Sequence, residues 1–133
     1  MEKVIACCGL NCAACEARIA TINNDDELRK VTAEKWKTIY NVPDMTPAMI
    51  NCTGCREDGA KLGHWSMCQI RVCAASKGFE TCGECKDMDT CTLVAPVHNF
   101  SPDAKLNLKN LNWIGDILWI AYFRIMYQKF RII

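Results

Sequence analysis

Residues 8–15 read CGLNCAAC and residues 82–85 read CGEC, and these cysteine-rich stretches decide how the chain folds. With residues 52–55 (CTGC) they form three Cys-x-x-Cys pairs: Cys12 with Cys15, Cys52 with Cys55, and Cys82 with Cys85. Two residues between the sulfurs let a tight turn aim both at one ion, while its amides hydrogen-bond the thiolates. One such pair is weak grounds for a metal site, but three within 133 residues are typical of a metal-binding domain.

Eleven cysteines are the composition of either a disulfide scaffold or a metal-binding domain. The redox compartment distinguishes the two. The first residues, MEKVIACC, contain an apolar run far too short for the core of a secretory signal peptide. We therefore expect a cytoplasmic protein, in which thiols stay reduced and bind metal rather than forming disulfides.

The charge balance argues against a nucleic-acid-binding module that works through clustered positive charge. The chain of 133 residues carries 16 Lys and Arg against 15 Asp and Glu, a formal net charge of +1. Half of its residues are hydrophobic, which is enough for one core of ordinary domain size. We expect one compact domain, in which a cysteine-rich metal-binding region (residues 1–100) is followed by a helical segment (residues 101–133) that packs on it.

Structural zinc takes four ligands in a tetrahedron, usually supplied as two pairs. The three pairs supply six cysteines, so two four-cysteine sites need two further ligands. The candidates for these are Cys8, Cys68, Cys73 and Cys91. A third site would require all eleven cysteines and either His64 or His98, and neither histidine lies at a ligand-like spacing. We favour two sites, and the spacing leaves open which pairs share an ion.

Cys7 is left out of the predicted ligand set, because neighbouring side chains on an extended backbone diverge. Cys8 is better placed, since it begins a Cys-x3-Cys-x2-Cys run. That run also has the spacing of the three-thiolate motif of enzymes that cleave S-adenosylmethionine, but 133 residues cannot build their large α/β barrel. A simple iron–sulfur cluster needs only four cysteines and is the alternative cofactor, although no cysteine here precedes a proline. The pattern favours zinc.

Helical patterns flank the cysteine turns. Residues 23–40 (NNDDELRKVTAEKWKTIY) predict a helix that Asn24 or Asp25 caps. Its expected core face contains Leu28, Val31 and Ile39. A short helix is expected near residues 47–51, and another over residues 67–77 with Gly78 at its C-terminus.

The last helix is predicted to begin at Ser101-Pro102-Asp103, which supplies a cap, a proline at the first helical position and an acid beside it. Apolar residues then continue at helical spacing, with a break expected near Gly115. Asp116 and Arg124 bracket an uncharged run far shorter than the roughly twenty residues of a bilayer span, so no transmembrane span is expected. A helix that is apolar on two faces can pack on its own core and also on a protein partner or a second copy of the chain.

The expected fold is mainly α, with irregular metal-binding cysteine loops, few short strands and a long C-terminal helix or helix pair. A catalytic zinc usually has mixed ligands and a nearby general base. The loose candidates for such roles are His64, Glu57, Asp58 and His98, and charged residues in a loop are normally just solvated. We therefore favour a non-enzymatic role and name no catalytic residue.

Several longer motifs stand in a characteristic order along the chain. They are CGLNCAACEARIAT, the DDELRK helix with Trp36, NCTGCREDG, CQIRVCAASKGFETCGEC with Cys91, and FSPDAKLNL. Over roughly residues 5–110 the chain thereby resembles a small bacterial and archaeal family known as domain of unknown function 3795. Its members are cysteine-rich, presumed to bind zinc and without an assigned activity. The resemblance implies that these residues fall on family cysteine positions: Cys8, Cys12, Cys15, Cys52, Cys55, Cys68, Cys73, Cys82, Cys85 and Cys91. Trp65 stands where many relatives have one more cysteine.

The sequence therefore predicts a zinc-binding protein that acts as a metal-stabilised structural or interaction module with two four-cysteine sites. The alternative is an iron–sulfur redox or sensor protein, and a zinc-dependent enzyme is favoured less. The expected partner is another protein or a second copy, bound through the apolar C-terminal helix.

Overall fold

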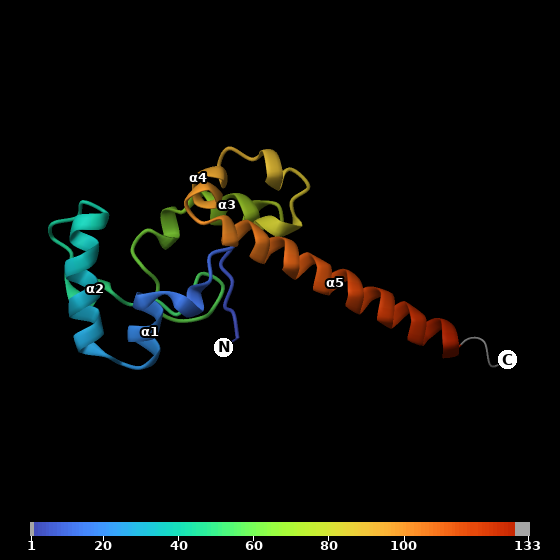
Figure 1. Ribbon diagram of the computed structural model, residues 1–133, viewed down its shortest axis with the longest axis horizontal. Coiled ribbons are helices and arrows are strands. Elements are labelled where there is room, and N and C mark those ends of the chain that lie inside the picture. The colour runs from blue at the N-terminus through green and yellow to red at the C-terminus, as the bar shows by residue number, and fades with distance from the viewer. Residues whose placement is uncertain (1, 130–133) are drawn as a thin grey trace.

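The structure is a computed structural model that describes the backbone of residues 2–129 and their side chains, apart from those of residues 113–116, 123 and 126–129. Its α-helices are α1 (Glu16–Ile22), α2 (Asp26–Ile39), α3 (Gln69–Ser76), α4 (Ala95–Phe100) and α5 (Pro102–Lys129). Short 3-10 turns lie between them: η1 (Cys12–Ala14), η2 (Pro47–Met49), η3 (Trp65–Met67), η4 (Cys82–Glu84) and η5 (Met88–Thr90). The only β pairing among the described residues is one isolated bridge between Ile5 and Asn11. The expectation of a mainly helical fold with a long C-terminal helix is confirmed (Figure 1).

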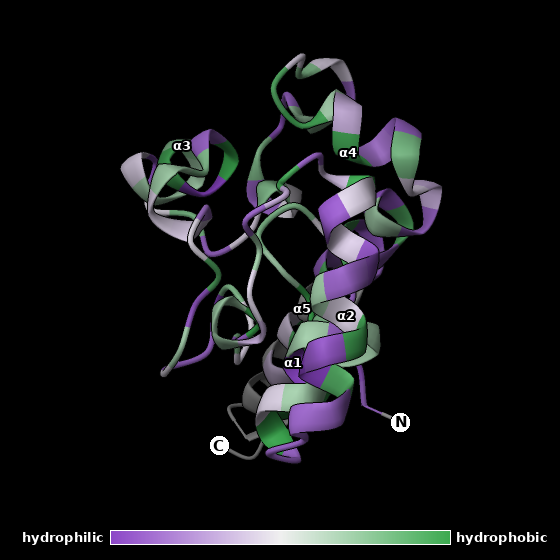
Figure 2. Cartoon of the chain, turned by 90° about the vertical axis from the view of Figure 1, so that its left-hand side faces the viewer, coloured by the Kyte–Doolittle hydropathy of each residue, from purple (hydrophilic) through white to green (hydrophobic). Residues whose placement is uncertain are grey.

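The helices α1 and α2 pack on each other as a hairpin at one end of the molecule (Figure 1), the end that faces the viewer in Figure 2. Small residues let them approach closely, since Ala17, Ala20 and Ala33 are fully buried. As the sequence predicts, Asp25 caps α2: its carboxylate accepts a hydrogen bond of 2.9 Å from the amide of Leu28.

The expected core face of α2 is wrong. Val31 and Ile39 are 63% and 57% exposed, whereas Arg29, Thr32 and Ala33 are buried. The reason is that α2 packs through Thr32 and Ala33 and not through Val31 and Ile39. The Arg29 side chain can be buried because it donates to Asn51, Asn24 and Asp26.

A second core cluster joins the N-terminal segment to the C-terminal half. It contains Ile5, Met88, Val94 and Leu108, and half-buried cysteines pack against it. Leu108 reaches this cluster from α5, which also contacts α4 and η4. The two clusters bury few large side chains, so packing alone gives the cysteine-bearing loops little support.

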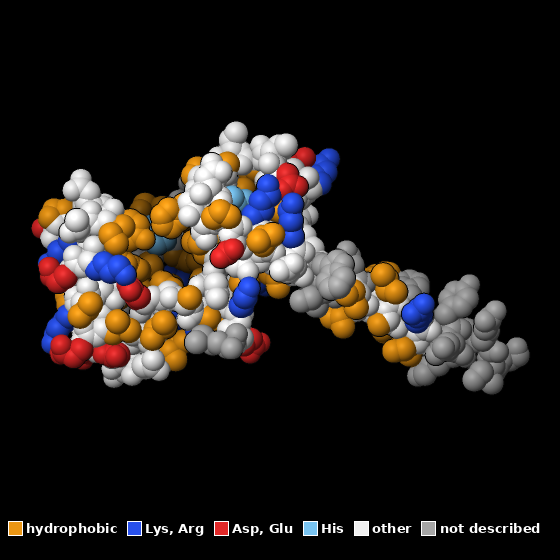
Figure 3. Space-filling model, viewed as in Figure 1, with side chains coloured by type: hydrophobic (Ala, Val, Ile, Leu, Met, Phe, Trp, Pro, Cys, Tyr) orange, Lys and Arg blue, Asp and Glu red, His pale blue; other side chains and the backbone are white. Residues whose placement is uncertain are grey.

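The helix α5 begins at Pro102, directly after Ser101, as the sequence predicts. The break expected near Gly115 is absent, because the helix runs continuously to Lys129. Its first turns pack on the body through Ala104 and Leu108, and the rest extends away from it (Figure 1). Hydrophobic side chains are visible on this extension (Figure 3). Within the described part of the chain, no helix has the length and apolar character needed to cross a membrane.

The shorter predicted helices are present. The turn η2 occupies the position of the short helix expected near residues 47–51, and α3 lies within the predicted residues 67–77. Gly78 follows α3 with φ = +74°, the left-handed conformation in which glycine commonly ends a helix. The helices α1 and α4 were not predicted, because each has only one or two turns and too few residues to show a period.

Candidate metal centres

Four of the 3-10 turns end on a cysteine in an extended conformation: Cys15 after η1, Cys68 after η3, Cys85 after η4 and Cys91 after η5. In each turn the cysteine amide donates to the carbonyl three residues earlier, over distances of 3.1 Å for Cys15, 3.4 Å for Cys68, 3.1 Å for Cys85 and 3.3 Å for Cys91. The chain therefore repeats one local structure, a 3-10 turn that is followed by a cysteine whose amide makes the closing hydrogen bond.

Two of these turns, η1 and η4, carry a cysteine at both ends and a side-chain cap in front. The Asn11 carbonyl oxygen accepts from the amide of Ala13 at 3.1 Å, and the Thr81 hydroxyl accepts from the amide of Gly83 at 3.2 Å. Such caps fix the turn before any ion arrives. The Cys52–Cys55 segment follows a different path, since Gly54 within it has φ = +118°.

The pairs Cys12–Cys15 and Cys52–Cys55 lie on two distant segments that the fold brings side by side, and these four residues are called the first cysteine group below. Cys15 packs against the core cluster that contains Cys52. The Cys55 thiol donates a hydrogen bond to the Cys12 sulfur, which lowers the pKa of Cys12 and raises that of Cys55. The positive charge of Arg18 also lowers the pKa of Cys12.

The second cysteine group consists of Cys73, Cys82, Cys85 and Cys91, which line a small cavity of about 30 Å³. They come from α3, from the two ends of η4 and from the residue after η5. The rest of the lining is apolar, apart from Lys77. Burial, followed by the neighbouring thiols, raises the pKa of Cys82 to about 12. The Lys77 Nζ atom lies 3.9 Å from the Cys85 sulfur.

Three cysteines remain outside these groups. Cys7 is buried and Cys8 packs against the second core cluster, and burial raises the pKa of both thiols. Cys68 stands at the N-terminus of α3. Of the ligands still needed after the three pairs, Cys73 and Cys91 line the cavity of the second group. Cys8 lies near thiols of both groups, because its charge raises the pKa of Cys55 and of Cys82, and Cys68 in turn raises the pKa of Cys8.

Neither histidine belongs to one of the two cysteine groups. The His98 ring is buried and its Nε2 atom lies 3.0 Å from the carbonyl oxygen of Cys8, so it links α4 to the N-terminal loop. His64 is exposed just before η3. All eleven cysteines are free thiols. Within residues 2–129, no three His, Cys, Asp or Glu side chains are already close enough to hold an ion.

Sequence reasoning missed two cations beside the thiols, Arg18 and Lys77. Arg18 follows Cys15 by three residues, and Lys77 follows Cys73 by four along α3. Both could have been found from one sequence feature, a basic residue that follows a cysteine by about one helical turn.

Trp65 occupies the first position of η3, where the other paired turns have a cysteine. Its ring nitrogen donates to the carbonyl of Cys55 at 3.0 Å, and the Arg71 guanidinium stacks 3.8 Å from the ring centroid. Trp65 therefore links the turn before α3 to the first cysteine group by a hydrogen bond.

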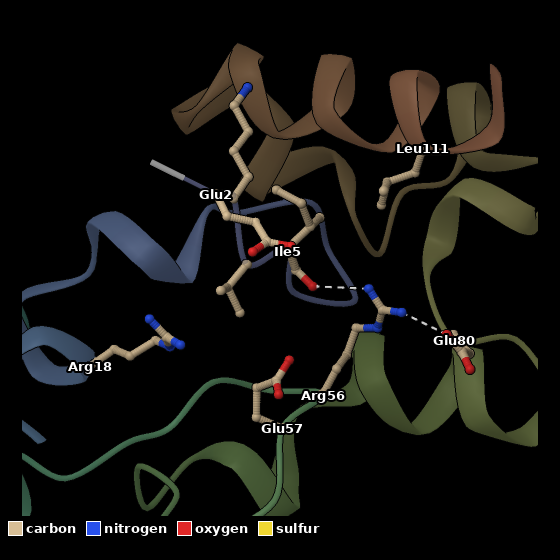
Figure 4. A pocket seen from close by; sticks show the side chains of 9 residues that line it. Glu2, Ile5, Arg18, Arg56, Glu57, Glu80 and Leu111 are labelled. Carbon is tan, nitrogen blue, oxygen red and sulfur yellow. Dashed lines mark hydrogen bonds and ion pairs between the residues drawn. The ribbon is translucent and has the colours of Figure 1, made fainter. Parts of the chain in front are cut away.

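A cleft of about 590 Å³ lies beside the first group, between Arg18 and Arg56 (Figure 4). Arg56 donates to the carbonyl of Ile5 and pairs with Glu80 at 2.6 Å. The charged residues that line the cleft are three acids and three bases: Glu2, Glu57, Glu80, Lys3, Arg18 and Arg56. The balance of signs gives this cleft no preference for an anion or a cation.

Residues 4–96, which include all eleven cysteines, match the family described as protein of unknown function DUF3795. The chain belongs to that family. No curated protein and no solved structure matches it. In this DUF3795 protein the matched region ends within α4, so α5 lies beyond it.

Proposed function

We propose that this DUF3795 protein is a zinc-stabilised interaction module with two four-thiolate sites. The first group (Cys12, Cys15, Cys52 and Cys55) holds one ion, and the second group (Cys73, Cys82, Cys85 and Cys91) holds the other. A closed shell of four thiolates is the donor set of structural zinc and leaves no open position for a substrate. The module acts by presenting α5 to a protein partner.

The observation that carries this proposal is the cavity of about 30 Å³ lined by the four thiols of the second group. Four thiols face one small space there, and four is the number of ligands that structural zinc takes. Four thiols around an otherwise apolar space are the softest donors that a protein offers, and they select zinc over hard cations. When bound, zinc holds these sulfurs as thiolates and crosslinks the turns that carry them.

The small core gives the ions a structural role. The side chains that are both large and fully buried are few within the described residues, and three of them are Ile50, Leu108 and Val94. The long loops between α2 and α3 and between α3 and α4 supply four buried residues to the two clusters, Ile50, Cys52, Met88 and Val94. Small domains with such cores commonly depend on a metal or disulfide crosslink.

The charge of each site is also compensated. A zinc ion with four thiolates carries a net charge of about −2, and burying it is unfavourable unless a cation lies close. Arg18 stands beside the first group and Lys77 beside the second. Each cation is well placed to act as an outer partner of its site, which stabilises the bound metal.

The test is metal content by mass spectrometry, with a visible spectrum, on full-length protein purified without oxygen. We expect about two zinc ions per chain and no colour. Iron with sulfide and a broad band near ~400 nm would instead establish an iron–sulfur protein. The variants Cys55→Ser and Cys85→Ser should each lose about one ion, whereas Cys7→Ser should keep both. Full metal content in both of the first two variants contradicts the assignment.

A further inference from the structure

The N-terminal segment of the chain has one backbone edge that is paired. On this edge the amide of Cys12 donates to the carbonyl oxygen of Val4 at 2.6 Å, and the amide of Ala6 donates to the carbonyl oxygen of Leu10 at 2.9 Å. The amide of Val4 also donates to the Asn11 side chain at 3.2 Å. These bonds hold the segment against the loop that leads into η1.

The direction of the opposite edge follows from the planarity of the peptide bond. In a trans peptide the carbonyl and the amide point in opposite directions, and none of the described peptide bonds is cis. Since the amide and the carbonyl of Val4 both point toward the paired edge, the carbonyl of Lys3 and the amide of Ile5 point away from it. The Ile5 carbonyl points away as well, and it accepts a hydrogen bond of 3.3 Å from Arg56 (Figure 4).

This second edge offers two backbone groups without a hydrogen-bond partner among the described residues, the carbonyl oxygen of Lys3 and the amide of Ile5. Ile5 is only 7% exposed, and buried backbone groups are nearly always paired. The cleft of about 590 Å³ is lined by both residues and by Arg56, so the unpaired edge faces it. Its volume lies in the range of ligand-binding pockets.

We propose that this unpaired edge binds an extended peptide segment of another protein, which places a basic side chain beside Glu57. The peptide donates to the carbonyl of Lys3 and accepts from the amide of Ile5, the pattern by which a strand is added to an exposed edge. The bond from Arg56 to the Ile5 carbonyl ends the paired stretch. The inference goes beyond the proposed function, because it adds a second interaction surface that does not depend on bound zinc.

The basic side chain follows from the charges that remain available in the cleft. Over the whole lining the signs balance, but the bases are already engaged within the chain: Lys3 by Asn107 at 3.0 Å, Arg18 by the carbonyl of Thr53 at 2.9 Å, and Arg56 by Glu80 at 2.6 Å. The Glu57 carboxylate has no hydrogen bond or ion pair with any described residue, and it points into the cleft (Figure 4). A Lys or Arg of the peptide supplies its partner.

The two walls of the cleft also predict the neighbour of this basic residue. Leu111 of α5 points into the cleft, and it lies on the opposite side of Ile5 from Glu57 (Figure 4). Successive side chains of a strand point to opposite sides. A peptide that sets its basic side chain against Glu57 therefore sets the next side chain toward Leu111, where an apolar residue fits.

The first experiment selects binders from a random heptapeptide library displayed on phage, against the full chain with its metal content measured in the same sample. We expect peptides in which Lys or Arg stands next to an apolar residue, with dissociation constants of about 1–100 μM by fluorescence anisotropy. Glu57→Gln should weaken binding about 5- to 10-fold. The matched control is Asp58→Asn, a neighbouring acid that does not line the cleft, and it should stay within about twofold.

Three results of this experiment overturn the proposal. They are the absence of any peptide that binds below about 1 mM, selected peptides that lack a basic residue, and equal effects of the two variants. A dimer in sedimentation velocity that the peptide dissociates would show a second copy at the edge, and it overturns the assignment to another protein.

The second experiment tests the backbone pairing itself by methylating the selected peptide at one amide nitrogen at a time. The amides of a paired strand point to its two sides in alternation, so every second methylation should weaken binding about 10-fold or more. In ¹⁵N NMR spectra the Ile5 amide should shift and become protected from hydrogen exchange, while the Val4 amide, which already donates to Asn11, should stay unchanged. Equal losses at successive positions of the peptide, or an unaffected Ile5 amide, overturn the proposal.

Discussion

Replacing Gly9 with alanine tests how α5 is seated on the body. Gly9 has φ = +97°, and a Cβ atom built on it would lie 2.0 Å from the carbonyl oxygen of Ala104 and 2.8 Å from Cγ of Leu108. Carbon and oxygen atoms ordinarily approach to about 3.3 Å, so the helix must retreat by roughly 1 Å. The Asn107 side chain also donates to the carbonyl of Gly9 at 3.0 Å, and the retreat strains this buried hydrogen bond.

The magnitude follows from three contributions. A positive φ in a residue with a Cβ costs about 1–2 kcal/mol. A retreat of about 1 Å forfeits a quarter to a half of the dispersion energy of the fully buried Leu108, about 1 kcal/mol. The weakened Asn107 hydrogen bond costs about another 1 kcal/mol. We therefore expect Gly9→Ala to reduce the free energy of unfolding by about 3–4 kcal/mol.

The matched control is Gly78→Ala, which changes a glycine with φ = +74° that has no heavy atom within 4 Å of the added Cβ. It carries the backbone cost alone, about 1–2 kcal/mol. Urea unfolding of the metal-loaded protein, followed by circular dichroism, measures both variants. Equal losses of stability in the two variants would refute the docking of α5 on the loop around Gly9.

Three further outcomes are expected. Leu108→Ala should cost about 2–5 kcal/mol in urea unfolding, whereas Leu106→Ala on the exposed side of the same helix should stay within about 0.5 kcal/mol. Removal of metal by a chelator should abolish the cooperative thermal transition of the cysteine-bearing loops, and a transition that survives with zinc absent contradicts a structural role. Lys105 and then Lys109 hydrogen-bond Asp89 and lower the pKa of that carboxyl, so their stabilising effect is complete above its ordinary pKa of about 4 and is lost as the pH falls through the lowered value. Titration of Asp89 by NMR should show the lowered pKa, and Lys105→Ala should raise it.

The parts of the fold that the sequence predicts well are those fixed by local chemistry. The cap at Asp25, the helix start at Pro102 and the glycine after α3 each depend on backbone groups within a few residues. The core face of α2 was predicted wrongly because a tertiary effect decides it. Close packing of Ala33 on α1 excludes the larger Val31, and no local pattern shows which neighbour a helix will meet.

In the cysteine groups, too, local features could be predicted from the sequence and tertiary ones could not. The sequence identifies the Cys-x-x-Cys turns, because two residues between the sulfurs have a local geometric meaning. The partner of each pair depends on chain paths that spacing does not encode. Cys12 meets Cys55 from across the α1–α2 hairpin, and Cys73 reaches the second group only because α3 lies beside η4 and η5.

The position of α5 depends directly on the cysteine turns, which links the proposed metal sites to the proposed interaction surface. Gly9 lies in the loop between Cys8 and Cys12, and Gly83 lies within η4, between Cys82 and Cys85. A Cβ at Gly83 would approach the carbonyl oxygen of Leu108 to 3.1 Å, and the Asn112 side chain donates to the Gly83 carbonyl.

The helix therefore rests on two glycines, one at the edge of each cysteine group, where the absence of a side chain permits close approach. A metal ion bound by the second cysteine group would fix η4 and with it the position of α5, and loss of that ion would free the base of the helix. Because Asn112 donates to the carbonyl of Gly83, between Cys82 and Cys85, the direction in which α5 leaves the body depends on the conformation of η4. Zinc in this protein would then do more than stabilise a small core: it would orient α5, the helix that the proposed module presents to a protein partner.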